Sequence, residues 1–203
     1  MNVNAESGVG EIQVIRYTVQ GFSKKTLKFL KATLDDERGL ASKDLPLHLS
    51  RGHGHTYQFK RCRKPHTPSV VISLTPRERM DAKFGDNPAL KNLSVTERGY
   101  PMRIYIDAVN WHTKPKDFGG SLTTYRQYLI QHEMGHCLGL DHEEPVPHQK
   151  CPVMYQQTKG TRQCQANPWF MRESGRKKRS TKKKKKKKSR HKVKERSTNK
   201  DLR

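Results

Sequence analysis

The pattern of apolar and polar residues along the chain predicts a mixed α/β fold. Short runs rich in β-branched and aromatic residues, bounded by Gly or Pro, are typical of strands. Such runs occupy residues 12–19, 56–61, 69–74, 93–96 and 103–109. Apolar residues three or four positions apart are typical of helices. That spacing occurs at residues 23–38 and 122–138, and a helical turn is expected at 77–84.

Both longer helices have recognisable ends. Ser23 and Ser121 stand at the positions where a side chain can cap the first turn of a helix. Gly39 follows the first helix and is expected to end it. The helix at 122–138 has apolar and aromatic residues on several faces, so we expect it to be buried at the centre of the domain. The segment at 111–120 contains several helix-breaking residues and is expected to be a loop.

The basic charge is concentrated at the carboxyl end of the chain. The 203 residues include 42 Lys and Arg against 19 Asp and Glu. Of these, 18 basic and 3 acidic residues lie at 172–203, whereas residues 1–171 are only modestly basic. Apolar residues are scarce after 171, so the tail cannot bury enough surface to offset the entropy of ordering. The sequence therefore predicts one folded domain at 1–171 and a disordered basic tail at 172–203.

Three interpretations of the tail remain open. It is a solvated polycation that aids solubility, a segment that binds nucleic acid or directs nuclear import, or a segment attracted to anionic membrane surfaces, for which no lipid anchor is visible. It has no interleaved aromatic residues, so any nucleic-acid binding is expected to be sequence-independent. The amino terminus lacks the pattern of a secretory signal, and no run is long enough for a membrane span. We therefore expect an intracellular protein, with nuclear or nucleic-acid association if the tail has that role.

The stretch HEMGHCLGLDH carries the candidate chemistry. His132 and His136 are four residues apart, so both can face one atom from the same side of a helix, with Glu133 beside that atom. Gly139 can turn the chain back in a left-handed conformation, which brings His142 from the other side. At this chain's composition the full pattern is expected by chance on the order of 1 in 10,000 times.

Three neutral imidazoles leave the fourth position of a zinc ion open to water, as a catalytic site requires. Zinc lowers the pKa of such a water from about 15.7 to roughly 7. A neighbouring carboxylate can then take its proton and pass it to the leaving amine. The sequence therefore predicts a Zn²⁺ site with His132, His136 and His142 as ligands and Glu133 as the catalytic base.

These residues resemble those of a known clan. The pattern HExxHxxGxxH followed by a methionine turn is similar to that of the metzincin zinc endopeptidases. Here it consists of His132, Glu133, His136, Gly139, His142 and Met154. Residues 125–170 more particularly resemble a little-characterised family of predicted secreted actinobacterial metalloproteases. Its VMxQQT, Cys and NPW pattern is matched by Val153, Met154, Gln156, Gln157, Thr158, Cys164, Asn167, Pro168 and Trp169.

The resemblance implies a metzincin-like α/β (α+β) fold. Such a fold has a twisted mixed sheet, an active-site helix and a small carboxy-terminal subdomain with the methionine turn. In that clan the methionine forms an apolar floor under the histidines, so Met154 is expected to do so here. Some members add a tyrosine ligand two residues after the methionine, a place that Gln156 occupies in this chain.

The four cysteines have different expected roles. Cys151 and Cys164 bracket a short loop and could form a disulfide in an oxidising compartment. Metzincins are often kept inactive by a segment that places a cysteine on the zinc, and Cys62 could be such a residue. Its position between two predicted strands favours an ordinary thiol. Cys137 lies in the motif helix and is expected to be buried and inert.

The function that the sequence favours is zinc-dependent hydrolysis of peptide bonds in a protein or peptide substrate. The alternative is a basic nucleic-acid-associated protein whose zinc domain is structural or catalytically inactive. The two could coexist, since the motif lies in residues 1–171 and the charge in 172–203.

Overall fold

The structure is a computed structural model that describes residues 11–49, 56–62 and 66–171. The chain divides into two units, Met1–Arg172 and Glu173–Arg203, and all described residues belong to the first. The predicted disorder of the tail and its nucleic-acid binding therefore concern residues outside the described ones. None of the helices in the described ranges is long and apolar enough to cross a membrane.

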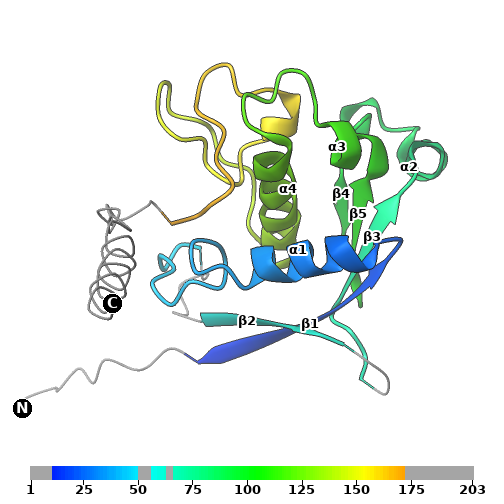
Figure 1. Ribbon diagram of the computed structural model, residues 1–203, viewed down its shortest axis with the longest axis vertical. Helices are drawn as coiled ribbons and strands as arrows, with labels where there is room; N and C mark the ends of the chain where they lie inside the picture. The colour runs from blue at the N-terminus through cyan, green and yellow to red at the C-terminus, as the bar shows by residue number, and fades with distance from the viewer. Residues whose placement is uncertain (1–10, 50–55, 63–65, 172–203) are drawn as a thin grey trace, which may run out of the picture. The chain divides into compact units, whose positions relative to one another are not determined.

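The described elements form one mixed sheet with helices packed on it (Figure 1). In chain order they are β1 (Ile12–Gln20), α1 (Lys24–Leu34), β2 (Thr56–Arg61), β3 (Val70–Thr75), α2 (Arg77–Phe84), η1 (Pro88–Leu90), β4 (Val95–Glu97), β5 (Met102–Asp107), α3 (Ala108–Thr113), α4 (Leu122–Cys137) and η2 (Gln157–Lys159). The mixed α/β fold that the sequence predicted is confirmed.

The sheet has the strand order β2-β1-β3-β5-β4. Strands β2, β1, β3 and β5 are parallel, and β4 pairs antiparallel with β5 through Thr96 and Ile104. The short strand β4 thus lies at one edge of the described sheet, on the side that α4 contacts. This edge becomes one wall of the cleft described below.

The core lies between the sheet, α1 and α4. Along β5, Ile104 and Ile106 are buried in this core, whereas the intervening Tyr105 faces the other side and contacts Phe84 of α2 with ring centroids 5.3 Å apart. Figure 1 shows α1 crossing α4, which stands between the sheet and the carboxy-terminal loops. Helix α4 is buried along most of its length, as the sequence predicted, so it is a rigid support.

The helix α3 was not predicted. We expected a strand to continue to residue 109 and a loop at 111–120, but β5 ends at Asp107. The carboxylate of Asp107 accepts a hydrogen bond from the backbone N–H of Asn110 (2.7 Å) and caps a new helix. The apolar residues after Asp107 continue the strand-like pattern, and this concealed the capping signal that Asp107 itself provides.

The first helix is shorter than predicted. It begins after Ser23, whose hydroxyl caps it, but it ends at Leu34 instead of reaching Gly39. The carboxylate of Asp36 accepts a hydrogen bond from the N–H of Arg38 (3.0 Å), and this local turn competes with further helix. Gly39 is needed for another reason, because a Cβ there would lie 2.3 Å from Nε2 of Gln131 on α4.

Candidate metal centre

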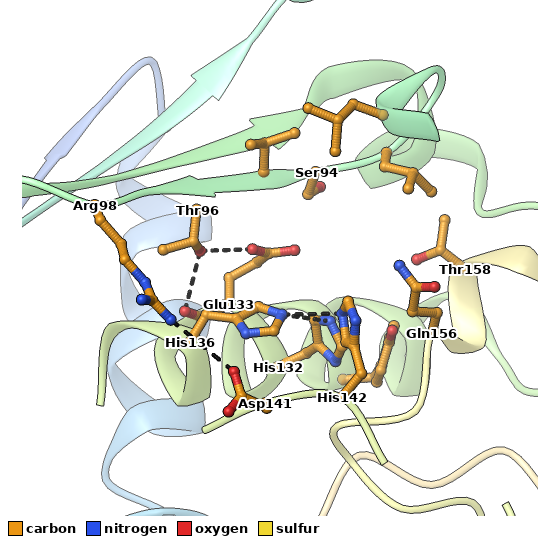
Figure 2. A pocket seen from close by; sticks show the side chains of 14 residues that line it. Ser94, Thr96, Arg98, His132, Glu133, His136, Asp141, His142, Gln156 and Thr158 are labelled. Atoms are coloured by element: carbon orange, nitrogen blue, oxygen red, sulfur yellow. Dashed lines mark hydrogen bonds and ion pairs between the residues drawn. The ribbon is translucent and has the colours of Figure 1, made fainter. Parts of the chain in front are cut away.

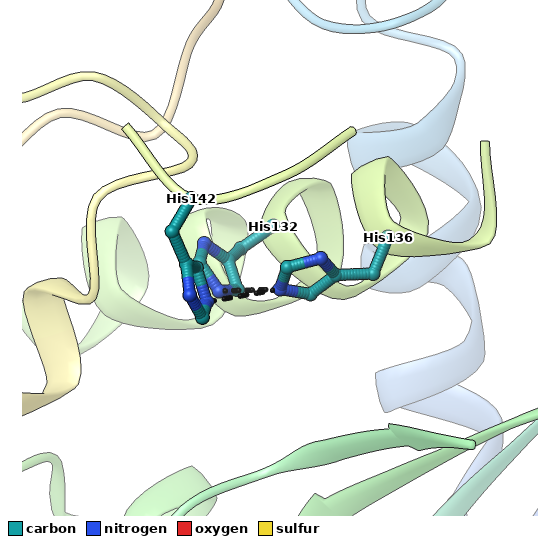
Figure 3. A group of neighbouring side chains, drawn as sticks. All are labelled: His132, His136 and His142. Atoms are coloured by element: carbon teal, nitrogen blue, oxygen red, sulfur yellow. Dashed lines mark hydrogen bonds between the residues drawn. The ribbon is translucent and has the colours of Figure 1, made fainter. Parts of the chain in front are cut away.

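The three histidines of the motif converge at the carboxyl end of α4 (Figure 3). Ser121 caps the helix that carries His132 and His136, and Gly139 turns the chain with a φ of 82°. The turn returns His142 to the other two rings. Nε2 of His136 lies 3.2 Å from Nε2 of His132 and 3.2 Å from Nε2 of His142, and the three candidate ligand atoms all lie within 4.8 Å of one another.

Backbone carbonyls determine which ring nitrogens face the centre. Nδ1 of His132 donates to the carbonyl of Val153 (2.8 Å), and Nδ1 of His136 donates to that of Leu140 (2.9 Å). Because these nitrogens carry the ring protons, the Nε2 atoms of both neutral rings present lone pairs to each other. Two lone pairs 3.2 Å apart cannot share a hydrogen bond, but they can share a cation.

The spacing also fits a metal ion. Zn–N bonds of about 2.0–2.1 Å in tetrahedral geometry place two ligand nitrogens roughly 3.3–3.4 Å apart. The two observed separations of 3.2 Å are close to that value. The three histidines are therefore positioned to bind a metal ion, with carbonyl groups orienting two of the rings as is usual around metal sites.

The environment keeps the imidazoles neutral, which is the form that binds metals. Burial, with a smaller contribution from the neighbouring His136, lowers the pKa of His132 to about 3. Burial also lowers the pKa of His136 and that of His142. His132 is buried, His136 is partly buried and His142 is exposed, so the group is open on the side of His142.

Glu133 lies beside the histidines and contacts the sheet. Its side chain is 4% exposed, and the hydroxyl of Thr96 on β4 lies 2.6 Å from its Oε2. Burial raises the pKa of Glu133 to about 7, which the hydrogen bond from Thr96 partly offsets. The contact with Thr96 was not predicted, because β4 lies 37 residues away and nothing in the local sequence indicates which strand faces the helix.

A cleft of about 310 Å³ opens in front of these residues, between β4 and α4 (Figure 2). Its lining includes the three histidines, Glu133 and Thr96. Arg98 and Asp141 lie at one end of the cleft, and Gln156 and Thr158 lie at the other. The candidate metal centre is therefore accessible to an elongated molecule that passes along the edge of β4.

The turn that contains Met154 holds the centre through three consecutive carbonyls. The carbonyl of Val153 orients His132, that of Met154 accepts from the N–H of Glu143 (3.2 Å), and that of Tyr155 accepts from the hydroxyl of Tyr128 (3.1 Å). Met154 is fully buried. It packs closely against α4 at Gly135, where an added Cβ would lie only 2.6 Å from Sδ of Met154. The sequence pattern alone did not indicate these backbone roles.

Two buried amides and a disulfide hold this turn in place. Nε2 of Gln157 donates to the carbonyls of Pro152 (3.0 Å) and Asn167 (2.7 Å), and its Oε1 accepts from the N–H of Asn167 (3.0 Å). The side chain of Asn167 donates in turn to the carbonyl of Cys151 (2.9 Å). Cys151 and Cys164 form the disulfide that the sequence left open.

The remaining cysteines do not belong to the candidate centre. Cys62 is a free thiol at the end of β2, and among the described residues the histidine group does not include it. Cys137 is also free, and burial raises the pKa of its thiol to about 12. A thiol with so high a pKa is unreactive at neutral pH, as expected for this residue.

Two solved structures of myroilysin are similar to this chain. The first, described as "Structure of myroilysin", is 17% identical with a TM-score of 0.34, and the match covers 66% of this chain and 52% of that one. The second, "Crystal structure of myroilysin", is 15% identical with a TM-score of 0.33 and covers 71% and 55%. The matches thus span about half the length of the myroilysin chains. None of the curated proteins matches this chain.

A protein family matches nearly the whole of the described domain. Residues 4–180 match the family whose description is "Protein of unknown function (DUF3152)". The matched range includes the sheet, the motif helix, the turn around Met154 and the disulfide. This chain belongs to the DUF3152 family.

Proposed function

We propose that this protein is a zinc-dependent endopeptidase of the metzincin type, with protein or peptide substrates. The observation that carries the proposal is the convergence of three neutral imidazoles on an open cleft beside a buried carboxylate. A structural zinc site is closed by four protein ligands. Three imidazoles that face a cleft instead leave a ligand position for water and substrate, which favours catalysis over a structural role.

The donor set supports zinc as the metal. Imidazole nitrogen is a good zinc ligand, and three of them with an open fourth position are a recurring arrangement in zinc enzymes. When bound to His132, His136 and His142, zinc would supply a Lewis acid that activates water and polarises a carbonyl. Met154 and Gly135 pack beneath the turn of α4 that carries these ligands, so the apolar packing supports their geometry.

Glu133 is positioned to move the proton in this reaction. Thr96 holds Oε2 of Glu133, which leaves Oε1 to accept a proton from the attacking water. The water oxygen adds to the carbonyl carbon of the scissile bond. Glu133 then gives the proton to the amide nitrogen as the C–N bond breaks, which yields an amine and a carboxylic acid that keeps the second proton of the water. The raised pKa of Glu133 suits a group that both accepts and donates a proton near neutral pH, although a bound cation would lower it.

Strand β4 provides a surface for the substrate. It lies at the edge of the described sheet and lines the cleft opposite α4. An extended peptide can add to such an edge through backbone hydrogen bonds. A peptide that pairs with β4 would run past Thr96 and Glu133, which places its backbone carbonyls close to the candidate metal centre.

The test compares Glu133→Gln with Glu144→Gln, which makes the same chemical change at an exposed carboxylate outside the cleft lining. Zinc content is measured by elemental analysis, and turnover is measured on a broad peptide library. We expect one zinc per chain in all three proteins. Glu133→Gln should lose turnover by about 10²- to 10⁴-fold, whereas Glu144→Gln should match the parent.

The possible negative results separate the parts of the proposal. A parent protein that binds zinc but cleaves no peptide would exclude the peptidase function. Full activity in Glu133→Gln would exclude this residue as the base. Failure to bind zinc, with folding intact, would exclude the metal site itself.

A further inference from the structure

The two ends of the cleft differ in chemistry. At one end, Arg98 and Asp141 have side chains 78% and 90% exposed and lie 3.9 Å apart, so they form a weak surface pair. Thr158 and Gln156 mark the other end in Figure 2. The buried Tyr128 also lines the cleft, and its hydroxyl donates to the carbonyl of Tyr155, the neighbour of Gln156. This second end is the one that can enclose a side chain.

The outer wall of that second end is the segment that leads into β4. Along β4 the chain passes from Arg98 through Thr96 to Ser94, away from Asp141 and toward Thr158 (Figure 2). Leu93 and Leu90 precede Ser94, and both line the cleft with half-buried side chains. We name the side chains of Leu90 and Leu93 the apolar wall. Leu90, Leu93 and Tyr128 all line the cleft, so together they give it an apolar portion.

Asn92 fastens the apolar wall to the rest of the domain. Its backbone has a φ of 61°, a left-handed conformation that Asn tolerates better than most residues. Nδ2 of Asn110 on α3 donates to the carbonyl of Asn92 (2.7 Å), and Nη1 of Arg77 on α2 donates to its side-chain oxygen. Next to the wall, the N–H of Asp107 donates to the hydroxyl of Ser94 (3.1 Å).

The groups that hold Asn92 are themselves rigid. Nη2 of Arg77 donates to Oδ1 of Asp107 (2.8 Å), and Nε lies 2.7 Å from Oδ2 as an ion pair without hydrogen-bond geometry. The Asp107 side chain is completely buried, so this charge-assisted contact restricts both side chains. Asp107 also caps α3 through Asn110. The wall is therefore positioned by a buried cluster that does not contact the candidate metal ligands in the described part of the chain.

We propose that Asn92 is a positioning residue that sets the apolar wall, and thereby makes this end of the cleft select a large apolar side chain of the peptide substrate. The inference rests on the proposed endopeptidase function. A wall held in a fixed position favours a side chain that fits the space it leaves. Without the bond to Arg77, Asn110 alone among the described residues holds residue 92 through its carbonyl, so the wall is held less firmly and selectivity falls, because discrimination by an apolar pocket depends on its shape.

Two substitutions isolate the side chain of Asn92. Asn92→Gly removes the bond to Arg77 but keeps a backbone that accepts positive φ. Asn92→Asp keeps an oxygen acceptor of the same size for Arg77 and is the conservative control. Lys31→Ala, which removes an exposed ion pair on α1, serves as a control for the handling of variant proteins. Thermal unfolding and zinc content are measured for each protein.

The readout is a ratio that does not depend on the fraction of active protein. The peptides are randomised on both sides of the scissile bond. At each position, the ratio is kcat/KM for a large apolar residue divided by kcat/KM for alanine. The parent and Asn92→Asp should prefer the large apolar residue at one position. In Asn92→Gly this preference should fall by about tenfold, mainly through KM, since uniform binding is lost.

Affinity in the Glu133→Gln background gives a second readout without turnover. Peptides bound to that inactive protein should show the same loss of preference when Asn92→Gly is added. An unchanged preference in Asn92→Gly, or a parent that cleaves peptides without any such preference, would overturn the inference and leave the endopeptidase function intact. A parent that cleaves nothing would overturn the proposed function, and the inference with it.

Discussion

The candidate centre joins two regions of the molecule that are built in different ways. Residues 11–137 form the sheet and the helices, and they supply His132, His136, Glu133 and Thr96. Residues 138–171 contain no strand or α-helix, and η2 is their one helical turn. This second region nevertheless supplies His142 and the carbonyl that orients His132.

The two regions also differ in what fixes their backbone. In the first, repeating hydrogen bonds of the sheet and helices hold the chain, so the loss of one bond leaves many others. In the second, the connections are a disulfide, the amides of Gln157 and Asn167, and single backbone bonds such as those that join residues 148–151 to 163–165. Substitutions in the second region should therefore disturb metal binding more, relative to their effect on overall stability, than substitutions in the first.

Loss of the disulfide should have the largest effect on stability. The bridge closes a loop between residues 13 positions apart, and a loop of that size contributes about 3 kcal/mol, largely through the unfolded chain. Replacing Cys151 and Cys164 together with serine should lower the free energy of unfolding by that amount. The proposed zinc affinity should fall as well, because Cys151 lies two residues before Val153. Urea unfolding and competition with a zinc chelator measure the two effects.

Cys62→Ser is the matched control, since Cys62 is a free thiol directly after β2. It should change neither quantity, and a reducing agent should weaken the parent as much as the double substitution does. If reduction leaves the parent unchanged in both stability and zinc affinity, the second region is held by its amides without help from the disulfide.

The sequence predicted the first region better than the second. Helix α4 is a long apolar stretch and strand β3 is a short β-branched run between two prolines, and the serine caps and the turn at Gly139 follow from local chemistry. The errors arose where a local bond overrides the pattern, as at Asp36 and Asp107. Spacing alone was sufficient to select the three histidines that converge, because that part of the geometry is local to one helix and one turn.

The contacts that complete the site could not be predicted, because they connect distant parts of the chain. Thr96 reaches Glu133 across 37 residues, and Gln157 bonds to Asn167 within a region that has no repeating structure. The resemblance drew attention to Gln157 and Asn167 as matched residues, but it did not reveal that they bind each other. Neither a hydrophobic repeat nor a helix-capping pattern in a single sequence indicates that the amides of Gln157 and Asn167 bind each other.

A pair of glutamines permits the most direct comparison of the two regions. Gln131 and Gln157 are both fully buried, and each joins two chain segments through its amide. Gln131 on α4 donates to the carbonyl of Thr33 (2.7 Å) and accepts from the N–H of Leu40 (3.0 Å). Replacing either glutamine by alanine should cost about 2 kcal/mol, because buried backbone groups lose their partners.

The two variants should differ in zinc affinity. Gln157→Ala loosens the turn that contains Val153 and Met154, so zinc affinity should fall by roughly 10- to 100-fold, as for other groups that orient metal ligands. Gln131→Ala should leave it nearly unchanged, although Gln131 is adjacent to His132, because its amide points to Thr33 and Leu40. Competition with a zinc chelator, measured on both variants, tests this difference in zinc affinity. Equal losses would show that the second region is no more sensitive than the first.

The smallest expected effect tests the contact between the two regions. By helix propensity alone, Gly135→Ala should stabilise α4 by about 1 kcal/mol, since alanine is the better helix former. The new Cβ would lie 2.6 Å from Sδ of Met154 and 3.5 Å from Cδ1 of Leu140. Overpacking of a buried site costs about 1 to 3 kcal/mol, and Met154 is completely buried, so its thioether has little free space in which to move. The clash should exceed the gain by about 1 kcal/mol, with a measurable loss of zinc affinity. Urea unfolding tests the expected loss of stability, and chelator competition tests the expected loss of zinc affinity. A more stable variant with unchanged zinc affinity would contradict both. It would mean that Met154 adapts freely and does not fix the position of the ligands on α4.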